Sequence, residues 1–470
     1  RSSSATRRQV ARDRSGASDG SPVGRNDTFE ALKTGSDPHY TALFAELEEL
    51  GIARADVLNA STFTTSDSTV PMDQARAFIA AQELPTLTDW AVVSTTPRVT
   101  VYSAAFQTYA LMDSTRAYEE FGSGRIRFDA SGTPAVVNRR AVRVGLTVPS
   151  DAPPPEGLPI VLYGHGTGGD HLTHVSDEGA ELARLGIAMI GFEAALHGER
   201  NPGGFVVDTL LASNPVAARE VVRQTVIDML LLYRMLAAGM IEVPASISGG
   251  VAIGFDASRV LYMGHSQGSQ EAGVLLGVEP TIEAAFLSEG GAGASISLMD
   301  RDATPGTRLV CLLSTVINER CEDMTEDHPV VAQILQPLLD PADPLSFAHR
   351  FQRERPASWV NLHIAMTEGT LDLETPPRAI EALATSIGLP IVAPVARSSD
   401  PYDLIGVPTV AAPVTANITL PSGGIVVGAL MQFEGLDHFA IYRDDDAKNR
   451  YVEFFRTLLA GGAPTLPAPL

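Results

Sequence analysis

The stretch RVLYMGHSQGSQEAG, residues 259–273, joins an apolar strand directly to a helix. The strand pattern ends at Gly264, and the helical pattern begins at Gln267, so Ser266 lies on a sharp turn. The same Gly-x-Ser-x-Gly spacing recurs around Ser18, within residues 1–36, which are rich in Ser, Gly, Arg and Asp. No apolar strand precedes Ser18 and no helical pattern follows it. The spacing alone therefore identifies no functional serine, and the surrounding pattern favours Ser266.

The glycines around Ser266 indicate a strained turn. Where a buried strand gives way at once to a helix, the residue between them takes an unusual backbone conformation that exposes its side chain. Gly264 and Gly268 remove the Cβ atoms that would collide as the strand and the helix approach each other. The start of the helix also favours negative charge that develops nearby. Ser266 is therefore predicted to be a nucleophile.

Alternating apolar strands and helices predict an α/β fold. LPIVLYGHGTGG (residues 158–169) is a short apolar strand that enters a glycine-rich loop, and LARLGIAMIGFEA (182–194) contains a second buried strand. A long amphipathic helix is predicted over residues 214–239, with Asn214 and Pro215 as its start signal. Uninterrupted apolar strands that alternate with helices are typical of a parallel sheet covered on both faces.

A serine hydroxyl needs a base to accept its proton, and the base needs a group that orients it. WVNLHIAMTEGTLDLETPP (359–377) predicts a strand followed by a loop that carries Asp372. IVVGALMQFEGLDHFAIYR (425–443) predicts a last strand followed by His438. Both side chains follow a strand, as Ser266 does, so the sequence places all three at strand ends.

From about residue 98 to 459 the chain resembles an α/β-hydrolase of the lipase or esterase kind. The matching segments, in the family's order, are YGHGTGG (163–169), GHSQG (264–268), EGTLDLETPP (368–377) and GLDHF (435–439). The resemblance implies a mostly parallel central sheet with helices on both faces. It also implies Ser266 as nucleophile, His438 as general base and then acid, and Asp372 as the orienting carboxylate.

Other residues could fill two of these roles. Glu368 and Glu374 flank Asp372 and are the alternative acids. His363 precedes the acid loop and is expected to point from a strand into the core, and Asp437 is expected to face solvent or to cap the next helix. His165, His171 and His174 offer a metal-site reading of the glycine-rich loop, but a carboxylate partner and a distant ligand are missing from the pattern.

The resemblance also implies two backbone donors for the oxyanion, the N–H groups of Thr167 and Gln267. Four further residues are expected to lie at the mouth of the substrate pocket: His165, Gly166, His265 and His197. No cofactor or metal is expected.

We expect four parts along the chain: a flexible tail (residues 1–36), a helical and extended segment packed on the core (37–97), the catalytic domain (98–462) and a C-terminal tail (463–470). An insertion over about residues 297–356 contains two short helices and is interpreted either as a lid or as ordinary core. The chain also has two cysteines, Cys311 and Cys321, ten residues apart, which we expect to form a disulfide if the protein is exported.

Composition excludes several classes of partner. The 470 residues carry a formal net charge of −22 and are 44% hydrophobic, with no apolar run long enough to span a membrane. Nucleic acid is excluded because it is bound through basic patches. The first residue is not methionine, which together with the polar N-terminal segment and the cysteine pair favours a secreted, periplasmic or cell-surface protein of a bacterium. The oligomeric state is not predicted.

The sequence therefore predicts a serine carboxylic-ester hydrolase, an esterase or lipase, that acts on a small-molecule, lipid or polymer ester through an acyl-enzyme. Two alternatives remain. The same triad could serve a peptidase or amidase, because the fold does not distinguish amides from esters. The chain could also be a non-catalytic binding protein of the cell envelope on a hydrolase fold, although every position of the triad carries a functional residue.

Overall fold

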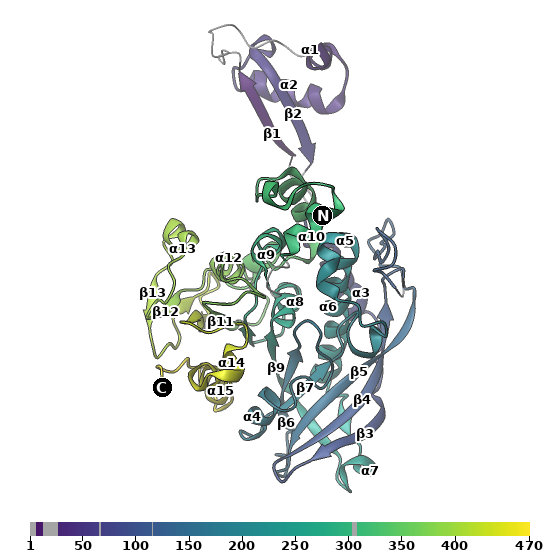
Figure 1. Cartoon of the computed structure of the whole chain (residues 1–470), viewed down its shortest axis with the longest axis vertical. Helices are drawn as coiled ribbons and strands as arrows, with labels where there is room; N and C mark the ends of the chain where they lie inside the picture. The colour runs from purple at the N-terminus through teal and green to yellow at the C-terminus, as the bar shows by residue number, and fades with distance from the viewer. Residues whose placement is uncertain (1–5, 13–26, 65–66, 115, 303–307) are drawn as a thin grey trace. The chain divides into compact units, whose positions relative to one another are not determined.

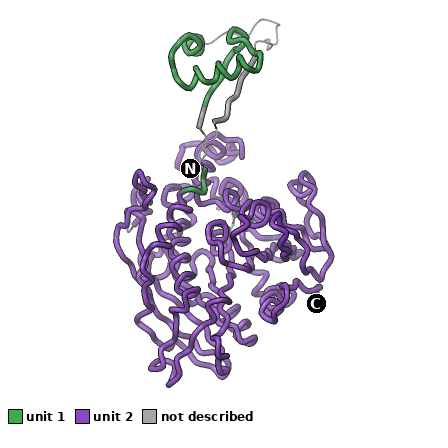
Figure 2. Tube along the Cα trace, turned by 180° about the vertical axis from the view of Figure 1, so that it is seen from behind, with its two compact units in different colours: residues 1–70 green, residues 71–470 purple. Residues whose placement is uncertain are grey.

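The computed structural model describes residues 6–12, 27–64, 67–114, 116–302 and 308–470. The chain divides into two compact units, residues 1–70 and 71–470, which Figure 2 draws in different colours. The predicted functional residues all belong to the larger unit.

The smaller unit consists of two strands and two helices. β1 (Thr6–Arg12) pairs antiparallel with β2 (Val57–Thr64), and α1 (Asp27–Thr34), α2 (Pro38–Glu49) and the 3₁₀ turn η1 (Arg54–Asp56) lie between them in sequence. Its core contains Phe29, Leu43, Phe44, Leu47 and Val57.

The flexible tail expected over residues 1–36 is therefore wrong for β1 and α1. A paired partner strand and the burial of Phe29 order these segments, and neither can be recognised from local composition. Ser18 lies outside the described residues.

The larger unit is built on a mixed sheet, with the strand order β13-β12-β16-β11-β10-β9-β6-β7-β5-β4-β3 and with β8 paired to β9 (Figure 1). All pairs from β13 to β7 along this path are parallel, and those from β7 to β3 are antiparallel. The strands are β3 (Thr88–Thr95), β4 (Val99–Ala110), β5 (Asn138–Pro149), β6 (Leu158–Gly164), β7 (Ala188–Phe192), β8 (Glu242–Val243), β9 (Ile253–His265), β10 (Ala284–Ser288), β11 (His363–Gly369), β12 (Ile391–Ala393), β13 (Thr409–Ala411) and β16 (Gly428–Phe433). β14 (Ile418–Thr419) and β15 (Ile425–Val426) form a separate antiparallel pair.

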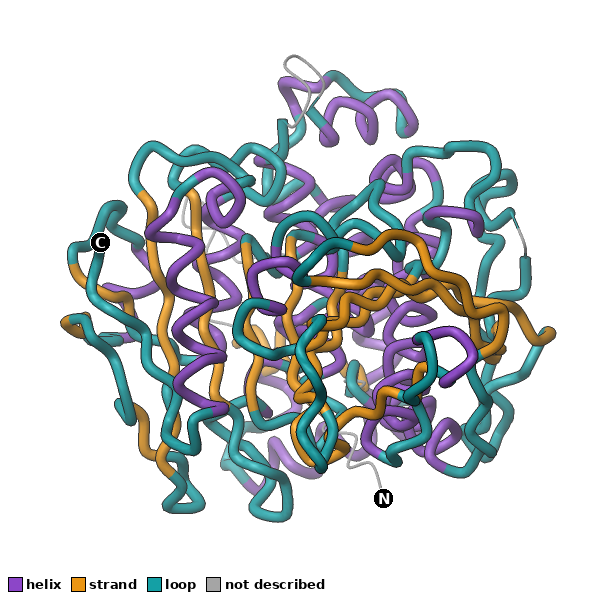
Figure 3. The backbone as a smooth tube through the Cα atoms, turned by 90° about the horizontal axis from the view of Figure 1, so that it is seen from below, coloured by secondary structure: helices purple, strands orange, loops and turns teal. Residues whose placement is uncertain are grey.

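Alternate residues of the central strands enter two different hydrophobic cores. In β9, for example, Tyr262 belongs to one core, whereas Leu261 and Met263 belong to the other. The first core contains residues of α3, α6, α8 and α12, and the second contains residues of α4, α14 and α15. Helices therefore cover both faces of the sheet, as predicted for the α/β-hydrolase fold, and Figure 3 shows the strands between them.

The helices vary greatly in length. The α-helices are α3 (Val70–Ala80), α4 (Glu178–Ala183), α5 (Leu210–Ser213), α6 (Pro215–Ala237), α7 (Ala245–Ser248), α8 (Gln267–Leu275), α9 (Ala294–Asp300), α10 (Leu309–Val316), α11 (Gln336–Leu339), α12 (Pro377–Ile387), α13 (Asp400–Ile405), α14 (Ala440–Arg443) and α15 (Asp445–Leu459). The predicted start of α6 is confirmed, because Asn214 is its N-cap and accepts a hydrogen bond from the N–H of Ala217.

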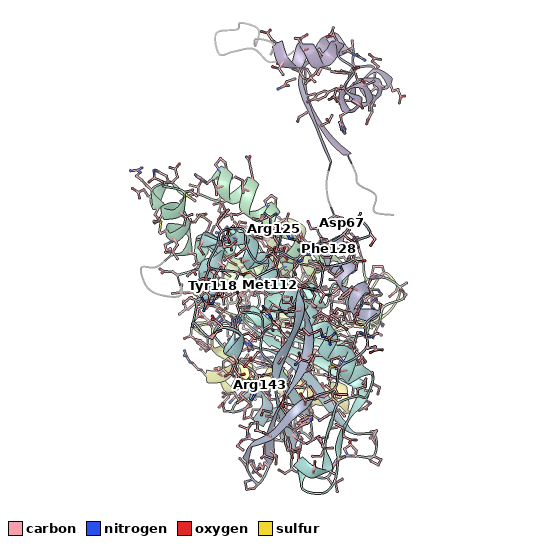
Figure 4. All side chains as sticks on the ribbon, turned by 90° about the vertical axis from the view of Figure 1, so that its right-hand side faces the viewer. Asp67, Met112, Tyr118, Arg125, Phe128 and Arg143 are labelled. Atoms are coloured by element: carbon pink, nitrogen blue, oxygen red, sulfur yellow. A yellow bond between two sulfur atoms is a disulfide. The ribbon has the colours of Figure 1, made fainter. Side chains whose placement is uncertain are left out.

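The connection from β4 to β5 packs against the start of α6. Four residues of this connection, Met112, Tyr118, Arg125 and Phe128, are labelled in Figure 4. The side chain of Asn214 donates to the carbonyls of Ala117 and Glu120, and Tyr118 stacks on Phe205 with ring centroids 4.3 Å apart. A buried cap of α6 thus also holds this connection.

The chain between β10 and β11 corresponds to the predicted insertion. It holds α9, α10, α11, a π-helical turn (Val330–Leu335) and the 3₁₀ turns η4 (Cys321–Asp323), η6 (Asp340–Ala342), η7 (Pro344–Ser346) and η8 (Ala348–Arg350). The predicted disulfide between Cys311 and Cys321 is confirmed, and it ties α10 to η4.

Two predicted boundaries differ from the structure. Residues 71–97 belong to the larger unit, because β3 pairs with β4 and the buried Met72 of α3 is part of the larger unit's core. The tail expected over residues 463–470 is also wrong, because Leu466 is fully buried and forms an antiparallel bridge with Val414.

One border of the sheet is irregular. β3 is the border strand next to β4, and its pairing shifts register between Thr88 and Ala91 and again between Val92 and Ser94. Asp89, within the first shift, has a positive φ of 57°. These shifts interrupt the regular pairing of β3 with β4, as β-bulges and similar irregularities do.

Among the described residues, no helix has both the length and the apolarity needed to cross a membrane.

Candidate active site

Ser266 occupies the predicted turn between β9 and α8. Its φ of 55° and ψ of −121° lie in a region that residues other than glycine rarely adopt. A Cβ atom on Gly268 would come within 2.1 Å of the Gly164 carbonyl oxygen, and one on Gly264 would lie 2.8 Å from backbone atoms of Gly268. The predicted need for both glycines is thus confirmed, because β9, β6 and α8 approach too closely for a side chain.

His438 and Asp372 lie in hydrogen-bonding contact after their respective strands. His438 Nδ1 is 2.7 Å from Asp372 Oδ2, and both side chains are almost fully buried. Asp372 Oδ1 in turn accepts the N–H groups of Glu374 and Thr375, each at 2.8 Å. The carboxylate is therefore fixed by its own loop, and it holds the imidazole with Nδ1 protonated and Nε2 available.

The strand register brings these residues to one edge of the sheet. β9, β10, β11 and β16 are parallel neighbours, so the residues that follow them lie side by side. The ring of His265, the residue before Ser266, lies 4.8 Å from the ring of His438, centroid to centroid. Among the described residues no hydrogen bond joins Ser266 Oγ to His438 Nε2, a contact that commonly tightens only when substrate binds.

Opposing effects set the pKa of His438. Burial, the largest effect, lowers it, whereas the hydrogen bond from Asp372 and the charges of Asp372, Glu289 and Glu374 raise it, and the net pKa is raised. Glu374 approaches from the side opposite Asp372, with Oε2 3.9 Å from His438 Nε2. The imidazole is therefore favoured as a proton acceptor.

The alternative acids and bases take other positions. Glu368 is fully buried and accepts from Gln432 rather than from His438. His363 accepts the N–H of Val427 at 2.9 Å at the start of β11, and burial lowers its pKa to about 4. Asp437 pairs with Arg443. Of the three candidate acids, Asp372 is the one bonded to Nδ1.

The two predicted oxyanion donors lie next to Ser266. In the described part of the chain, the N–H groups of Thr167 and Gln267 have no acceptor. A Cβ atom on Gly166 would lie 3.1 Å from Ser266 Cβ, so the absence of a side chain at this glycine lets the loop after β6 reach the serine. Both N–H groups therefore lie close to Ser266 and without an acceptor among the described residues.

A chain of side-chain hydrogen bonds connects the two donor residues. The hydroxyl of Thr167 donates to Gln267 Oε1 at 2.9 Å, and Gln267 Nε2 donates to Glu271 Oε1 at 2.8 Å. Burial raises the pKa of Glu271 to about 8. At the other end, the Thr167 hydroxyl lies 3.3 Å from Asp208, which pairs with Arg301 at 2.7 Å. The chain holds the loop after β6 against the start of α8.

A cavity of about 120 Å³ opens beside Ser266. Its walls include Thr167, Gln267 and Glu374 together with residues of α5, α6 and the insertion. Of the residues predicted for the pocket, Gly166 lies close to Ser266 but is not among the residues that line the cavity.

The histidines predicted for the pocket do not line this cavity. His165 Nδ1 bonds to the carbonyl of Gly166 and its Nε2 to the N–H of Ala194, and burial lowers its pKa to about 4. His197 Nδ1 bonds to the carbonyl of Ala195, and His265 Nδ1 lies 3.0 Å from Ser288 Oγ. The three rings are buried and are not among the residues that line the cavity, so the prediction is wrong for them.

The metal-site reading finds no support. His171 pairs with Glu193 at 3.1 Å, and over the described residues no group of three or more His, Cys, Asp or Glu side chains could hold an ion.

Glu289 is a residue that sequence reasoning missed. It follows β10 directly, has a positive φ of 45°, and is fully buried. Its Oε2 accepts the hydroxyls of Ser288 and Thr367 and lies 3.8 Å from His265 Nδ1, and burial raises its pKa to about 8. An acidic residue directly after the buried strand AAFLS was the available signal, because that strand ends at the same edge as the triad.

No family model and no curated protein matches the sequence. Similar solved structures include an acetyl xylan esterase from Paenibacillus sp. R4 (14% identity, 83% of this chain and 94% of that chain covered, TM-score 0.47) and acetyl xylan esterase 1 from Thermoanaerobacterium sp. JW/SL YS485 (11%, 82% and 93%, TM-score 0.47). A dienelactone hydrolase described as putative, from Klebsiella pneumoniae, is similar at 16% identity, with 75% and 98% covered and a TM-score of 0.38. The strand order and the site geometry, which are independent of these likenesses, carry the inferences that follow.

Proposed function

We propose that the chain is a serine carboxylic-ester hydrolase that acts through an acyl-enzyme. The proposal is supported above all by one observation: the strained Ser266 lies at the same sheet edge as the buried His438–Asp372 pair. The free N–H groups of Thr167 and Gln267 add the two donors that an oxyanion requires.

The first half-reaction forms the acyl-enzyme. Ser266 Oγ attacks the ester carbonyl carbon, and its proton moves to His438 Nε2. The carbonyl oxygen becomes an anion that accepts hydrogen bonds from Thr167 and Gln267, while Asp372 stabilises the imidazolium through Nδ1. The intermediate then expels the alcohol, which takes the proton from Nε2.

The second half-reaction releases the acid. A water molecule attacks the acyl carbon and gives one proton to His438 Nε2, and the same two N–H groups bind the new oxyanion. When the intermediate collapses, the carbon–Oγ bond breaks and the proton returns from Nε2 to Ser266. The acid leaves and the enzyme is restored.

The test compares Ser266 with Ser18, the two serines that lie in a Gly-x-Ser-x-Gly sequence. Ser266→Ala should abolish hydrolysis of p-nitrophenyl acetate and covalent labelling by a fluorophosphonate, with unchanged circular dichroism. Ser18→Ala should keep both the hydrolysis and the labelling. Full activity in Ser266→Ala, or a wild-type protein that is neither labelled nor active, would refute the proposal and favour a binding protein.

The ester part of the proposal has its own test. An ester and an anilide of the same acyl group are compared by kcat/KM, and the ester is expected to react at least about 100-fold faster, a difference of about 2.7 kcal/mol in barrier. A faster anilide would identify a peptidase or amidase on the same triad.

We further propose that the protein works outside the cytosol. The Cys311–Cys321 disulfide supports this location, since disulfides persist in oxidising compartments. Thiol titration of the denatured protein, isolated from its native source with free thiols blocked at lysis, should find both cysteines oxidised. Two free thiols would contradict the proposal.

A further inference from the structure

Apolar residues from two parts of the chain line the cavity beside Ser266. Leu211 of α5 and Val221 and Val222 of α6 line it from the α5–α6 hairpin. Leu339 at the end of α11 and Pro344 at the start of η7 line it from the insertion. Ser266 therefore lines a slot whose apolar walls come mainly from α6 and from the segment between β10 and β11.

Four of the five charged side chains of the wall, Asp208, Arg219, Arg301 and Asp343, already have partners, and the fifth, Glu374, lies beside His438. Arg301 Nη2 is 2.7 Å from Asp208 Oδ2, and the buried Asp343 accepts the N–H groups of Gly293 and Ala294 at 3.0 and 2.7 Å. A charged group on a bound substrate would have to compete with these contacts after losing its own hydration. The slot therefore favours an uncharged, apolar group.

The size of the cavity limits that group. Its volume is about 120 Å³, whereas an engineered apolar cavity of about 150 Å³ holds benzene, with its six carbons. A chain of more than about five carbons would have to leave the cavity through its open side or displace wall residues, which are close-packed.

We propose that this slot is the acyl-binding site and that it selects short, uncharged acyl groups of up to about five carbons. The proposal rests on the proposed ester hydrolysis and adds the substrate class. Each methylene that the slot buries should raise kcat/KM about fourfold, and each methylene that does not fit should lower it. The insertion thus forms part of the specificity site.

The experiment measures kcat/KM for p-nitrophenyl esters with acyl groups of two, four, six, eight and ten carbons. The optimum of the wild type is expected at four carbons, with an at least tenfold lower value at eight. An optimum at eight carbons or more would overturn the proposal.

Substitutions in the slot should move the optimum. Val222→Ala widens the apolar wall and should shift the optimum toward six carbons. Ala218→Leu, at another lining position of α6, fills the slot and should restrict the enzyme to acetyl esters. The matched control is Val226→Ala, one helical turn further along α6, where the side chain is fully buried and does not line the cavity. It should lower the melting temperature and leave the optimum at four carbons.

The outcomes separate the two proposals. If the wild type is not labelled by a fluorophosphonate and hydrolyses none of the esters, ester hydrolysis itself fails. If it is labelled and active, but Val222→Ala and Val226→Ala have the same chain-length profile as the wild type, only the acyl site fails.

Discussion

At the scale of single residues, the site depends on a backbone conformation that Ser266 tolerates poorly. Its positive φ costs a residue with a Cβ atom about 1–3 kcal/mol, which the surrounding packing must offset. The position of Ser266 in the cavity wall and its strained backbone thus both follow from one turn.

This strain predicts a stability difference between two inactive variants. Ser266→Gly should unfold at a higher temperature than Ser266→Ala by about 1–2 °C, because glycine adopts this φ without a Cβ clash even after its own entropy cost. Calorimetry of both variants checks the order. An alanine variant at least as stable as the glycine variant would mean that the turn stores no strain.

The hydroxyl of Thr167 donates a hydrogen bond to Gln267 and is not required to touch the substrate. Its loss is nevertheless expected to lower kcat. Thr167→Val keeps the shape and the backbone N–H but loses the donor, so kcat should fall about tenfold with little change in KM, less than the roughly 100-fold cost of losing an oxyanion donor outright. A boronic acid that mimics the tetrahedral intermediate should bind more weakly by the same factor as kcat/KM falls.

Thr167→Ser is the control for this prediction, since it retains the hydroxyl and should restore most of the activity. An equal loss in the serine and valine variants would assign the effect to the threonine methyl group instead.

The residues that sequence predicts well are those with a local signal. Ser266, Asp372 and His438 each follow an apolar strand, and the carboxyl ends of neighbouring parallel strands meet at one edge. Val221 and Val222 gave no signal, because a cavity wall on an amphipathic helix has the same pattern as ordinary core. The contact of Glu374 with Nε2 was likewise unpredictable, since it depends on how the acid loop folds back.

At the scale of elements, the close approach of β9, β6 and α8 decides which glycines near Ser266 can accept a side chain. Gly264 has backbone atoms of Gly268 and Ser269 within 2.8 Å of a built Cβ, whereas Gly254, in the same strand, has no atom within 4 Å of one. Strand position alone therefore does not decide which glycine is required.

Gly264→Ala should lower the melting temperature strongly or leave the protein insoluble, because backbone atoms must move to admit the methyl group. Gly254→Ala should change the melting temperature by less than about 2 °C, as expected for a site without a steric conflict. Thermal melts of the two purified variants check the contrast. Equal melting temperatures for the two variants would show that the turn around Ser266 can relax to admit the methyl group.

The elements themselves follow from the sequence where hydrophobic periodicity is strong. The long helix α6 was predicted together with its cap, since Asn214 and Pro215 give a local start signal. β1 was not predicted, because its pairing with β2 joins residues about fifty positions apart, and no local pattern encodes that contact.

At the scale of the whole molecule, four buried carboxyl groups keep their protons to unusually high pH. Burial raises the pKa of Glu178 to about 7 and those of Glu271, Glu289 and Glu368 to about 8, from an ordinary value of 4.5. Between about pH 4.5 and pH 8 the folded state therefore binds more protons than the unfolded state. The free energy of unfolding must therefore fall as the pH rises through this window.

Buried histidines act in the opposite direction at lower pH. Burial lowers the pKa of His165 and His363 to about 4 and that of His174 to about 3, from 6.5. Below 6.5 the unfolded state binds protons that the folded state does not, so stability falls as the pH drops. Above pH 6.5 only the carboxyl groups still act, so the two groups together place the stability maximum below about pH 6.5.

The melting temperature should accordingly be higher at about pH 6 than at about pH 8.5. Glu289→Gln removes one of the titrating groups and should reduce this difference, whereas Glu156→Gln, on an exposed loop, should leave it unchanged. A melting temperature that rises from pH 6 to 8.5 would contradict the carboxyl assignments.

The bulged border strand β3 affects how copies of the protein behave at high concentration. A straight, open border offers a long row of backbone donors and acceptors on which another molecule can extend the sheet. The two register shifts, around Asp89 and around Val93, divide β3 into short regular segments. A second molecule that paired with β3 would therefore form few backbone hydrogen bonds. The register shifts therefore make β3 a poor template on which a second copy could extend the sheet.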